Sequence, residues 1–389
     1  MTPVDTLDWA SVLVVDDEPA NVALLAQLLM RVGVAQVHTS VDPRQALGMY
    51  EALRPDLVLL DLHMPGMDGL ALMAAIARST DPDDAVPVVI LTADSTAPAR
   101  ERALAAGASD FLTKPFDLTE VELRARNLLQ TRALHSRLRA ELEERRAAEI
   151  EAQEEAERRR AAVQRVLDAG GPRMVFQPIV ILPTGKVVGY EALARFDDEP
   201  VRPPDEWFAD AASVGLGDAL ELAAVDAALR HLPLVEPEHI IGVNVSPSVA
   251  ASDELDRLLA RYPAHRVVLE VTEHVPVADY DVLLAALDRL RSRGVSLAVD
   301  DAGAGYAGLD HILRLQPNFI KLDISLTRGI DTSPVKRALA SALTRFAAEI
   351  GSHITAEGIE TGAELGTLTD LGVTAGQGYF LGRPEPLQA

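Results

Sequence analysis

Six apolar stretches in the second half of the chain each lead into a polar group that can bind a metal ion or move a proton. In chain order these groups are Glu191, Asn244, Glu270, Asp300 with Asp301, Lys321 and Glu357. Short apolar stretches of this length are typical of buried β-strands. Carboxylate and amide oxygens bind hard divalent cations such as Mg²⁺ rather than zinc or copper. The pattern therefore indicates an oxygen-lined metal site with one lysine beside it.

A smaller set of the same kind lies in the first third of the chain. Strand-like stretches are followed by Asp16 and Asp17, by Asp61 and by Thr92, and Lys114 precedes Pro115. Three carboxylates suit Mg²⁺, and Asp61 would be free to attack a phosphoryl group. Thr92 and Lys114 could then contact the phosphoryl oxygens.

Both sets need strands whose carboxyl ends lie together. In the first segment, strand-like stretches at 12–15, 57–60, 88–91 and 111–112 alternate with helical ones, which indicates an α/β domain with a doubly wound parallel sheet. Such a sheet binds ligands at the carboxyl ends of its strands, where the strand order switches. In the second half, a barrel of alternating strands and helices would gather the carboxyl ends of all its strands at one face.

The two segments are joined by a long helical stretch. Residues 118–168 contain neither glycine nor proline and are rich in helix-forming residues. Leu128, Leu138 and Leu142 fall roughly on a heptad seam, whereas Thr131 and His135 interrupt it. The helix is thus either a dimerising coiled coil or a solvated single helix. The expected domains are 1–130, a helical linker at 131–169, and 170–389.

Composition excludes several classes of function. The 389 residues include no cysteine, which rules out disulfides and thiolate metal sites. A net charge of −23 argues against a nucleic-acid polymer as partner, although a small anion can bind through metal ions. No apolar run approaches membrane-spanning length, and the N-terminus does not resemble a signal peptide, so we expect a cytoplasmic protein without a membrane partner. Only four of the 36 basic residues are lysines, so a lysine inside a motif suggests a specific need for an ammonium group.

The first segment resembles the receiver domain of two-component response regulators. The motifs that carry the resemblance are Val-Val-Asp-Asp-Glu at 14–18, Asp-Leu-His-Met-Pro-Gly-Met-Asp-Gly at 61–69, Leu-Thr-Ala at 91–93 and Lys-Pro-Phe at 114–116. It implies a flavodoxin-like fold, one Mg²⁺ held by Asp16, Asp17 and Asp61, and a sensor histidine kinase that phosphorylates Asp61. It also implies Thr92 with Phe111 as the switch pair and Lys114 beside them. A receiver that only dimerises and is never phosphorylated stays open.

Residues 172–386 are similar to the EAL family of cyclic di-GMP phosphodiesterases. The matching motifs are Glu-Ala-Leu-Ala-Arg at 191–195, Asn-Val-Ser-Pro at 244–247, Glu-Val-Thr-Glu at 270–273, Asp-Asp-Ala-Gly-Ala-Gly at 300–305, Lys-Leu-Asp at 321–323, Glu-Gly-Ile-Glu at 357–360 and Gln-Gly-Tyr-Phe at 377–380. The resemblance implies a TIM-barrel-like (β/α)8 fold. Hydrolysis of an anionic phosphodiester benefits from two metal ions that neutralise charge and activate water.

The resemblance also implies roles for individual residues. One Mg²⁺ or Mn²⁺ would be held by Glu191, Asn244, Glu270 and Asp300, and a second by Asp300, Asp301 and Glu357. Lys321 would lie beside the attacking water and act with Glu191 and Glu357 in catalysis. The implied contacts to the substrate are Gln177, Leu193, Arg195, Asp323 and Gln377. Glu273 would steady the loop after Asp301 and link it to dimer packing, and Glu360 would support the second metal.

Two departures from the family pattern stand out. Ala302-Gly303-Ala304-Gly305 replaces the usual Phe-Gly-Thr-Gly, and Phe196 replaces a frequent tryptophan. Every implied metal ligand is nevertheless present. The sequence thus predicts a homodimeric response regulator that hydrolyses cyclic di-GMP to linear pGpG under the control of Asp61 phosphorylation. The alternatives are a barrel that senses cyclic di-GMP or docks a protein without hydrolysis, and an output through protein interactions of the helix. No Gly-Gly-Asp/Glu-Glu-Phe cyclase motif is present.

Overall fold

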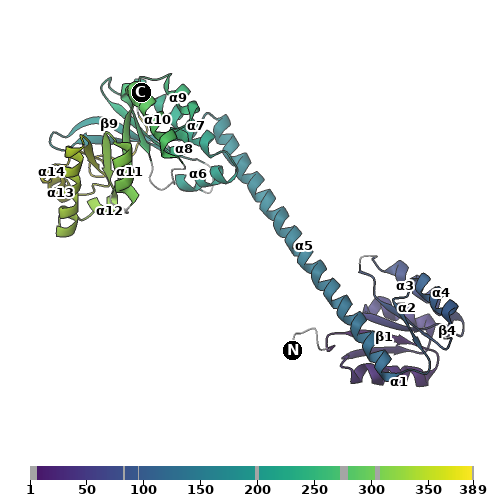
Figure 1. The fold of residues 1–389 in the computed structure, drawn as a ribbon. Coiled ribbons are helices and arrows are strands. Elements are labelled where there is room, and N and C mark those ends of the chain that lie inside the picture. The colour runs from purple at the N-terminus through teal and green to yellow at the C-terminus, as the bar shows by residue number, and fades with distance from the viewer. Residues whose placement is uncertain are drawn as a thin grey trace. The chain divides into compact units, whose positions relative to one another are not determined.

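A computed structural model describes residues 7–81, 84–94, 96–197, 201–271, 279–302 and 307–387 (Figure 1). For residues 97, 99–100, 301–302 and 307–310, only the backbone is described. The chain forms two compact units, Met1–Glu151 and Ala152–Ala389, which we describe separately. None of the described helices is both long enough and apolar enough to cross a membrane.

The first unit contains a five-stranded sheet in the order β2-β1-β3-β6-β7, with every neighbouring pair parallel. The strands are β1 (Ser11–Val15), β2 (Gln36–Ser40), β3 (Leu57–Asp61), β6 (Val88–Thr92) and β7 (Asp110–Thr113). The helices are α1 (Pro19–Arg31), α2 (Pro43–Leu53), α3 (Gly69–Ser79) and α4 (Ala97–Ala105), and β4 (His63–Met64) pairs with β5 (Met67–Asp68) in a small hairpin. The sheet order and parallel pairing confirm the predicted flavodoxin-like fold. The edge strand β2 was not predicted from the sequence, because most of its residues are polar or partly exposed.

Alternation along the strands explains why helices cover both faces of this sheet. Val12 and Val14 of β1 pack in one cluster with Leu25 of α1, whereas Leu13 and Val15 pack in another with Tyr50 of α2. Successive side chains of a strand point to opposite faces, so an unbroken apolar strand buries both faces. The core of the unit therefore has two halves separated by the sheet.

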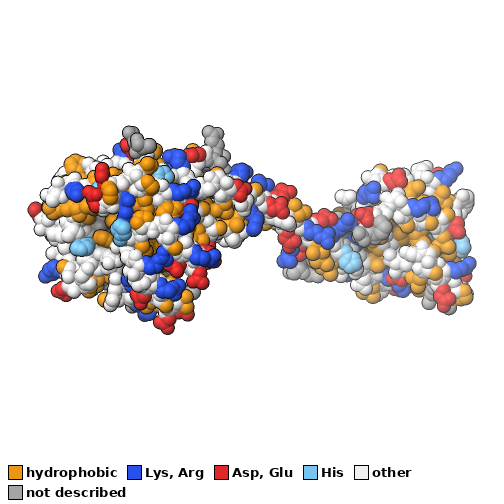
Figure 2. All heavy atoms as spheres, turned by 90° about the horizontal axis from the view of Figure 1, so that it is seen from above, with side chains coloured by type: hydrophobic (Ala, Val, Ile, Leu, Met, Phe, Trp, Pro, Cys, Tyr) orange, Lys and Arg blue, Asp and Glu red, His pale blue; other side chains and the backbone are white. Residues whose placement is uncertain are grey.

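Helix α5 (Leu118–Asp168) confirms the predicted helix without glycine or proline. Val121, Ala125 and Leu129 near its start are buried in the first unit, and Val163 near its end is buried in the second. Between these ends, acidic and basic side chains are interspersed along the helix surface (Figure 2). Leu138 and Leu142 are exposed there. The coiled coil stays a prediction.

The second unit is built on a closed eight-stranded barrel in the order β10-β11-β12-β13-β14-β15-β8-β9. The strands are β8 (Arg173–Ile181), β9 (Lys186–Arg195), β10 (Ile240–Val245), β11 (Val267–Val271), β12 (Ser296–Ala302), β13 (Phe319–Leu322), β14 (His353–Ala356) and β15 (Ala375–Gly376). The described helices are α6 (Pro204–Ser213), α7 (Gly217–Leu229), α8 (Pro247–Ala250), α9 (Asp253–Leu259), α10 (Tyr280–Ser292), α11 (Ala307–Leu315), α12 (Ile324–Thr327), α13 (Pro334–Glu349) and α14 (Gly362–Asp370). This closed barrel with surrounding helices confirms the TIM-barrel-like fold class.

Strand β8 corrects one detail of the predicted barrel. It runs antiparallel to both of its neighbours, β9 and β15, so the carboxyl ends of the eight strands do not all meet at one face. The reason is its connection to β9, which is only a turn at residues 182–185. A short turn can join antiparallel strands, but a parallel pair needs a crossover of a dozen or more residues.

The position of the site residues along the strands is a second correction. Glu191, Asn244, Glu270, Asp300 and Lys321 lie within their strands rather than after them, and Glu357 alone of the predicted set follows its strand. Inward positions of a closed barrel are flanked by strands on both sides, so these polar side chains are surrounded more fully than groups in a terminal loop. The predicted site therefore lies inside the barrel, near the carboxyl ends of its parallel strands.

Candidate functional sites

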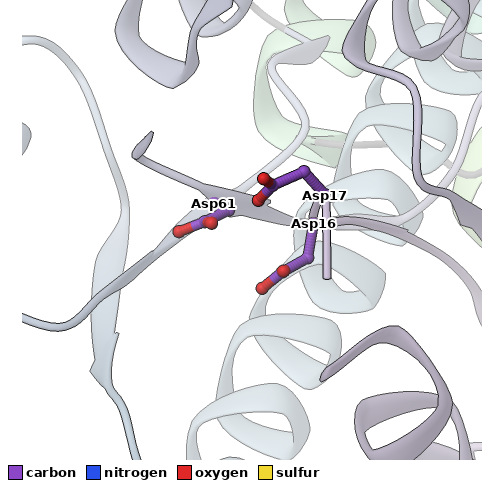
Figure 3. A group of neighbouring side chains, drawn as sticks. All are labelled: Asp16, Asp17 and Asp61. Carbon is purple, nitrogen blue, oxygen red and sulfur yellow. The ribbon is translucent and has the colours of Figure 1, made fainter. Parts of the chain in front are cut away.

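Three carboxylates meet at one edge of the sheet in the first unit. Asp16 and Asp17 directly follow β1, and Asp61 ends the neighbouring strand β3 (Figure 3). One oxygen from each of the three lies within 4.8 Å of the others. Within the described residues, this is the only set of three or more acidic, histidine or cysteine side chains whose ligand atoms all lie within that distance of one another. Oxygen donors at this spacing fit Mg²⁺.

Lys114 closes this site from the end of β7. Its Nζ lies 2.8 Å from Asp16 Oδ2 and 3.0 Å from Asp61 Oδ2, and Asn21 donates to both Asp16 oxygens at 3.1 Å. Burial raises the pKa of Asp61, and the Lys114 ammonium only partly offsets this effect. A divalent cation would therefore relieve the crowding of negative charge at Asp61.

The predicted switch residues lie on the adjacent strands β6 and β7. Thr92 is buried at the end of β6, and its Oγ1 accepts a hydrogen bond from the backbone N–H of Asp94 at 3.0 Å. Phe111 of β7 is half-buried, with the Arg124 guanidinium 5.2 Å from its ring centroid. Their role as a switch pair stays a prediction.

Lys321 is the centre of the candidate site in the barrel. Its Nζ lies 3.2 Å from Glu191 Oε2, 2.6 Å from Glu357 Oε1 and 3.5 Å from Asp300 Oδ1, and it also forms a salt bridge with Glu270. Only 4% of the lysine side chain is exposed. Strands β9, β11 and β12 and the end of β14 thus bring four predicted carboxylates to the ammonium group that Lys321 of β13 carries.

The electrostatics of this cluster follow from burial and crowding. Burial alone would lower the pKa of Lys321, but the surrounding carboxylates raise it well above its ordinary value. Burial also raises the pKa of Glu270 far above its ordinary value, and the neighbouring Glu191 raises it further. The carboxylates therefore favour the protonated form of Lys321, while burial and mutual repulsion oppose ionisation of Glu270.

Amide side chains complete the cluster. Asn244 Nδ2 donates to Glu191 Oε1 at 3.1 Å, and Gln377 Nε2 donates to Glu357 Oε1 at 3.2 Å and to Glu191 Oε2. These contacts orient Glu191 from two sides. The donor set, consisting of four carboxylates and one amide oxygen around a single lysine, fits hard divalent cations by its chemistry. The predicted division of these ligands into two metal sets is a separate proposal.

Other predicted substrate contacts lie outside the lysine cluster. Gln177 is buried on β8 and donates to the Gly382 carbonyl at 3.1 Å. Arg195, at the end of β9, donates to the Ala194 carbonyl, and together with Leu193 it lines a separate small cavity that Asn244 also lines. These residues surround the cluster without entering its salt bridges.

Asp323 and Glu360 have clear structural partners. The Asp323 carboxylate caps helix α12 by accepting the Ser325 N–H at 2.8 Å. Glu360 is exposed and forms a salt bridge with Arg328, beside a cavity that Gln177, Glu357 and Gln377 also line. Glu273, Gly303, Ala304 and the side chain of Asp301 lie outside the described residues.

Sequence reasoning missed Glu364, which holds the loop after β14. This buried carboxylate accepts backbone N–H groups of Gly329 at 2.7 Å, Glu360 at 2.9 Å and Thr361 at 3.0 Å. Its sequence signal is the pattern Thr-x-x-Glu at 361–364, a capping box for helix α14. The loop that it supports carries Glu357 into the lysine cluster.

Comparison with known proteins agrees with this geometry. The family model "EAL domain" matches residues 158–384, and the model "Response regulator receiver domain" matches residues 12–126. The cyclic di-GMP phosphodiesterase RocR of Pseudomonas aeruginosa is 30% identical over 397 aligned positions, which cover 97% of each protein. The similarity to RocR therefore includes both units and the helix that joins them.

Solved structures resemble the second unit in particular. "PaMucR Phosphodiesterase, c-di-GMP complex" is 28% identical, with a TM-score of 0.53 over 59% of this chain and 98% of that one. A calcium and cyclic di-GMP complex of BlrP1 from Klebsiella pneumoniae is 31% identical, with a TM-score of 0.50 over 56% of each chain. The chain belongs to the EAL domain family and is a response regulator whose receiver domain precedes its EAL domain.

Proposed function

We propose that this protein hydrolyses cyclic di-GMP to linear pGpG in the barrel of its second unit, and that phosphorylation of Asp61 regulates the reaction. The observation that carries the proposal is the Lys321 cluster, in which three carboxylates from strands and one directly after a strand face one buried ammonium. RocR, similar over 97% of its length, is a cyclic di-GMP phosphodiesterase.

The acidic cluster explains why an anionic substrate would need divalent cations. We propose that Glu191, Asn244, Glu270 and Asp300 hold one Mg²⁺ or Mn²⁺, and that Asp300, Asp301 and Glu357 hold another. When bound, the ions would neutralise the phosphodiester and activate water for attack. Without them, four carboxylates around one lysine would repel the substrate's phosphates.

The chain's own residues would then position the reactants. Lys321 cannot move freely, because its salt bridges fix Nζ among groups from four strands, and it therefore offers a fixed donor to water or to a phosphate oxygen. Asn244 and Gln377 keep Glu191 in place through hydrogen bonds to its two oxygens. Arg195 is the proposed phosphate clamp, since a guanidinium matches two phosphate oxygens. Gln177, Leu193, Asp323 and Gln377 are proposed to line the substrate, and Glu273 and Glu360 to support the metal-binding loops.

The receiver site is proposed to bind one Mg²⁺ and to accept a phosphoryl group on Asp61 from a sensor histidine kinase. Asp61 lies beside Asp16 and Lys114, so a phosphoryl group on it would be met by a metal ion and an ammonium. We further propose that the chain forms a homodimer, with the exposed seam leucines Leu138 and Leu142 of α5 in the interface.

A single assay tests the enzyme and the switch together. Purified full-length protein is incubated with cyclic di-GMP in Mg²⁺ or Mn²⁺, with and without beryllofluoride as a mimic of phospho-Asp61, and the nucleotides are separated. Formation of pGpG at a rate that changes with beryllofluoride supports both parts of the proposal. Tight binding of cyclic di-GMP without turnover in either metal would favour a cyclic di-GMP sensor over an enzyme. Turnover at a rate that beryllofluoride does not change would support the enzymatic activity but contradict its regulation through Asp61.

A further inference from the structure

The barrel contains a large cavity beneath the Lys321 cluster. Its volume is about 560 Å³, and its walls include Ile179, Ile240, Val268, Ala298 and Phe319. Exposed residues of the lining, Pro183, Glu238 and His353, lie at the amino-terminal end of the parallel strands. The cavity therefore faces the end of the barrel opposite the candidate catalytic residues.

The strand register places this cavity one layer below the catalytic groups. Val268 precedes Glu270 by two residues on β11, Phe319 precedes Lys321 on β13, and Ala375 precedes Gln377 at β15. Residues two apart in a strand point to the same side. Glu270, Lys321 and Gln377 also line the cavity, so the catalytic layer forms its inner end.

Small side chains at inward positions leave this space open. Barrels of this type are ordinarily filled by layers of bulky branched residues. Here Ala298 lies two positions before Asp300, and Ala375 two positions before Gln377. A cavity of this size and apolar lining is in the range that binds small organic ligands.

One residue of the lining, Gln377, has a buried polar atom without a partner in the described part of the chain. Gln377 is 4% exposed and donates through Nε2 to Glu191 and Glu357, but its Oε1 is buried with no hydrogen-bond partner among the described residues. An unsatisfied buried carbonyl is costly, so a donor supplied by a ligand would be favoured there. An anion would be disfavoured, because four carboxylates lie within 3.5 Å of the neighbouring Lys321 Nζ, and one of them, Glu270, lines the cavity itself.

We propose that this cavity is a second ligand site, which takes a small neutral aromatic molecule with one N–H or O–H donor aimed at Gln377 Oε1. The occupant would touch Lys321 and Glu270 from below and leave the substrate face free. It would therefore change kcat for cyclic di-GMP more than KM, a consequence that rests on the proposed function. The binding itself does not depend on that activity.

Indole and 1-methylindole form a matched pair of probes, because they share the aromatic rings but only indole has an N–H donor. Binding of each to the full-length chain is measured by saturation-transfer NMR and calorimetry. We expect indole to bind roughly five-fold more tightly than 1-methylindole, as befits one hydrogen bond. The variant Ala298→Leu fills the cavity and should weaken indole binding at least about ten-fold, as expected when an apolar pocket is occupied.

Ala342→Leu adds the same side chain on the exposed surface of α13 and should bind indole like the parent. If Ala298→Leu does not fold, Val188→Phe, which narrows the outer part of the cavity, provides the same test. Absence of indole binding to the parent, or equal binding to the filled variants, overturns the site. Indole binding that leaves kcat unchanged would overturn only the link between the cavity and catalysis. Absence of cyclic di-GMP hydrolysis would overturn the proposed function, and the binding data would still decide whether the site exists.

Discussion

In both units a lysine neutralises a group of neighbouring carboxylates, but the two lysines differ in their exposure to solvent. Each places one lysine among carboxylates near the carboxyl ends of parallel strands. Lys114 pairs with two carboxylates and is 22% exposed, whereas Lys321 pairs with four and is 4% exposed. The receiver carboxylates lie close enough to share one cation, but the barrel carboxylates converge on the lysine itself.

Sheet closure accounts for this difference. An open sheet presents its site at an edge, and there Lys114 keeps partial contact with water although Asp16 and Asp61 are buried. A closed barrel surrounds the site with strands, so water cannot screen the carboxylates and a buried counter-ion is needed. The comparison shows that the same residue types have different energetic roles when the sheet that carries them closes.

The largest expected effect is on turnover. Glu191→Ala removes a proposed metal ligand that also contacts Lys321, Asn244 and Gln377. We expect hydrolysis of cyclic di-GMP to fall by about 10³-fold or more, equivalent to roughly 4 kcal/mol of activation free energy. Steady-state kinetics check this, with Glu349→Ala, at an exposed position of α13, as the control. A loss of turnover smaller than ten-fold would contradict the assignment of Glu191 as a metal ligand.

Lys321→Met tests the role of the buried ammonium in stability. It leaves four carboxylates without their internal cation, so in EDTA the second unit should lose about 3–5 kcal/mol of unfolding free energy. Added Mn²⁺ should restore part of the loss, because a divalent ion can neutralise the same oxygens. Denaturant unfolding measures both values, and Lys186→Met, at an exposed lysine, serves as the control. Equal stability of the two variants in EDTA would contradict the comparison.

Glu364→Gln tests a buried carboxylate that is stabilised by backbone N–H groups instead of a lysine. Although burial opposes ionisation, hydrogen bonds from Gly329, Glu360 and Thr361 lower the pKa of Glu364 below its ordinary value of 4.5. Because the pKa of Glu364 is lower in the folded chain than in the unfolded chain, its ionisation stabilises the fold at pH values above the unfolded-state pKa. This contribution is lost as the pH falls through the folded-state pKa. The variant should be about 1.5–3 kcal/mol less stable at pH 7, which is the range for hydrogen bonds to a charged group.

The stability gap between Glu364→Gln and the parent should shrink on acidification below about pH 4.5, near the ordinary pKa of glutamate. Urea titrations at several pH values measure it, with Glu349→Gln as the exposed control. A gap that does not change with pH would mean that the carboxylate charge contributes nothing.

Lys114→Met should have the smallest effect on stability. Its partners Asp16 and Asp61 are buried, but the lysine itself is partly exposed, so we expect a loss of about 1 kcal/mol, at the top of the range for exposed ion pairs. The variant should nevertheless lose the response of turnover to beryllofluoride, because Lys114 contacts Asp61 at 3.0 Å. Thermal unfolding and the hydrolysis assay give the two readouts, with Lys186→Met as control. A loss as large as that of Lys321→Met would remove the distinction between the two sites.

The sequence by itself determined which residues can do chemistry and the type of each fold. Apolar stretches leading into Asp61, Glu270 or Lys321 are local signals, and an uninterrupted glycine-free and proline-free stretch is enough to specify helix α5. The capping box at Thr361 and Glu364 was equally local and could have been recognised. These features follow from neighbours in the chain, and the sequence alone therefore contains them.

Only the tertiary structure decided how those residues meet. The reversed direction of β8, the salt bridges of Lys321 to groups 130 and 51 residues earlier, and the cavity below them all depend on barrel closure. Contacts over such separations result from packing of the whole chain, and no local pattern records the distances between their atoms. Burial then sets the charge states, because the cost of ionising Glu270 depends on every strand that excludes water from it.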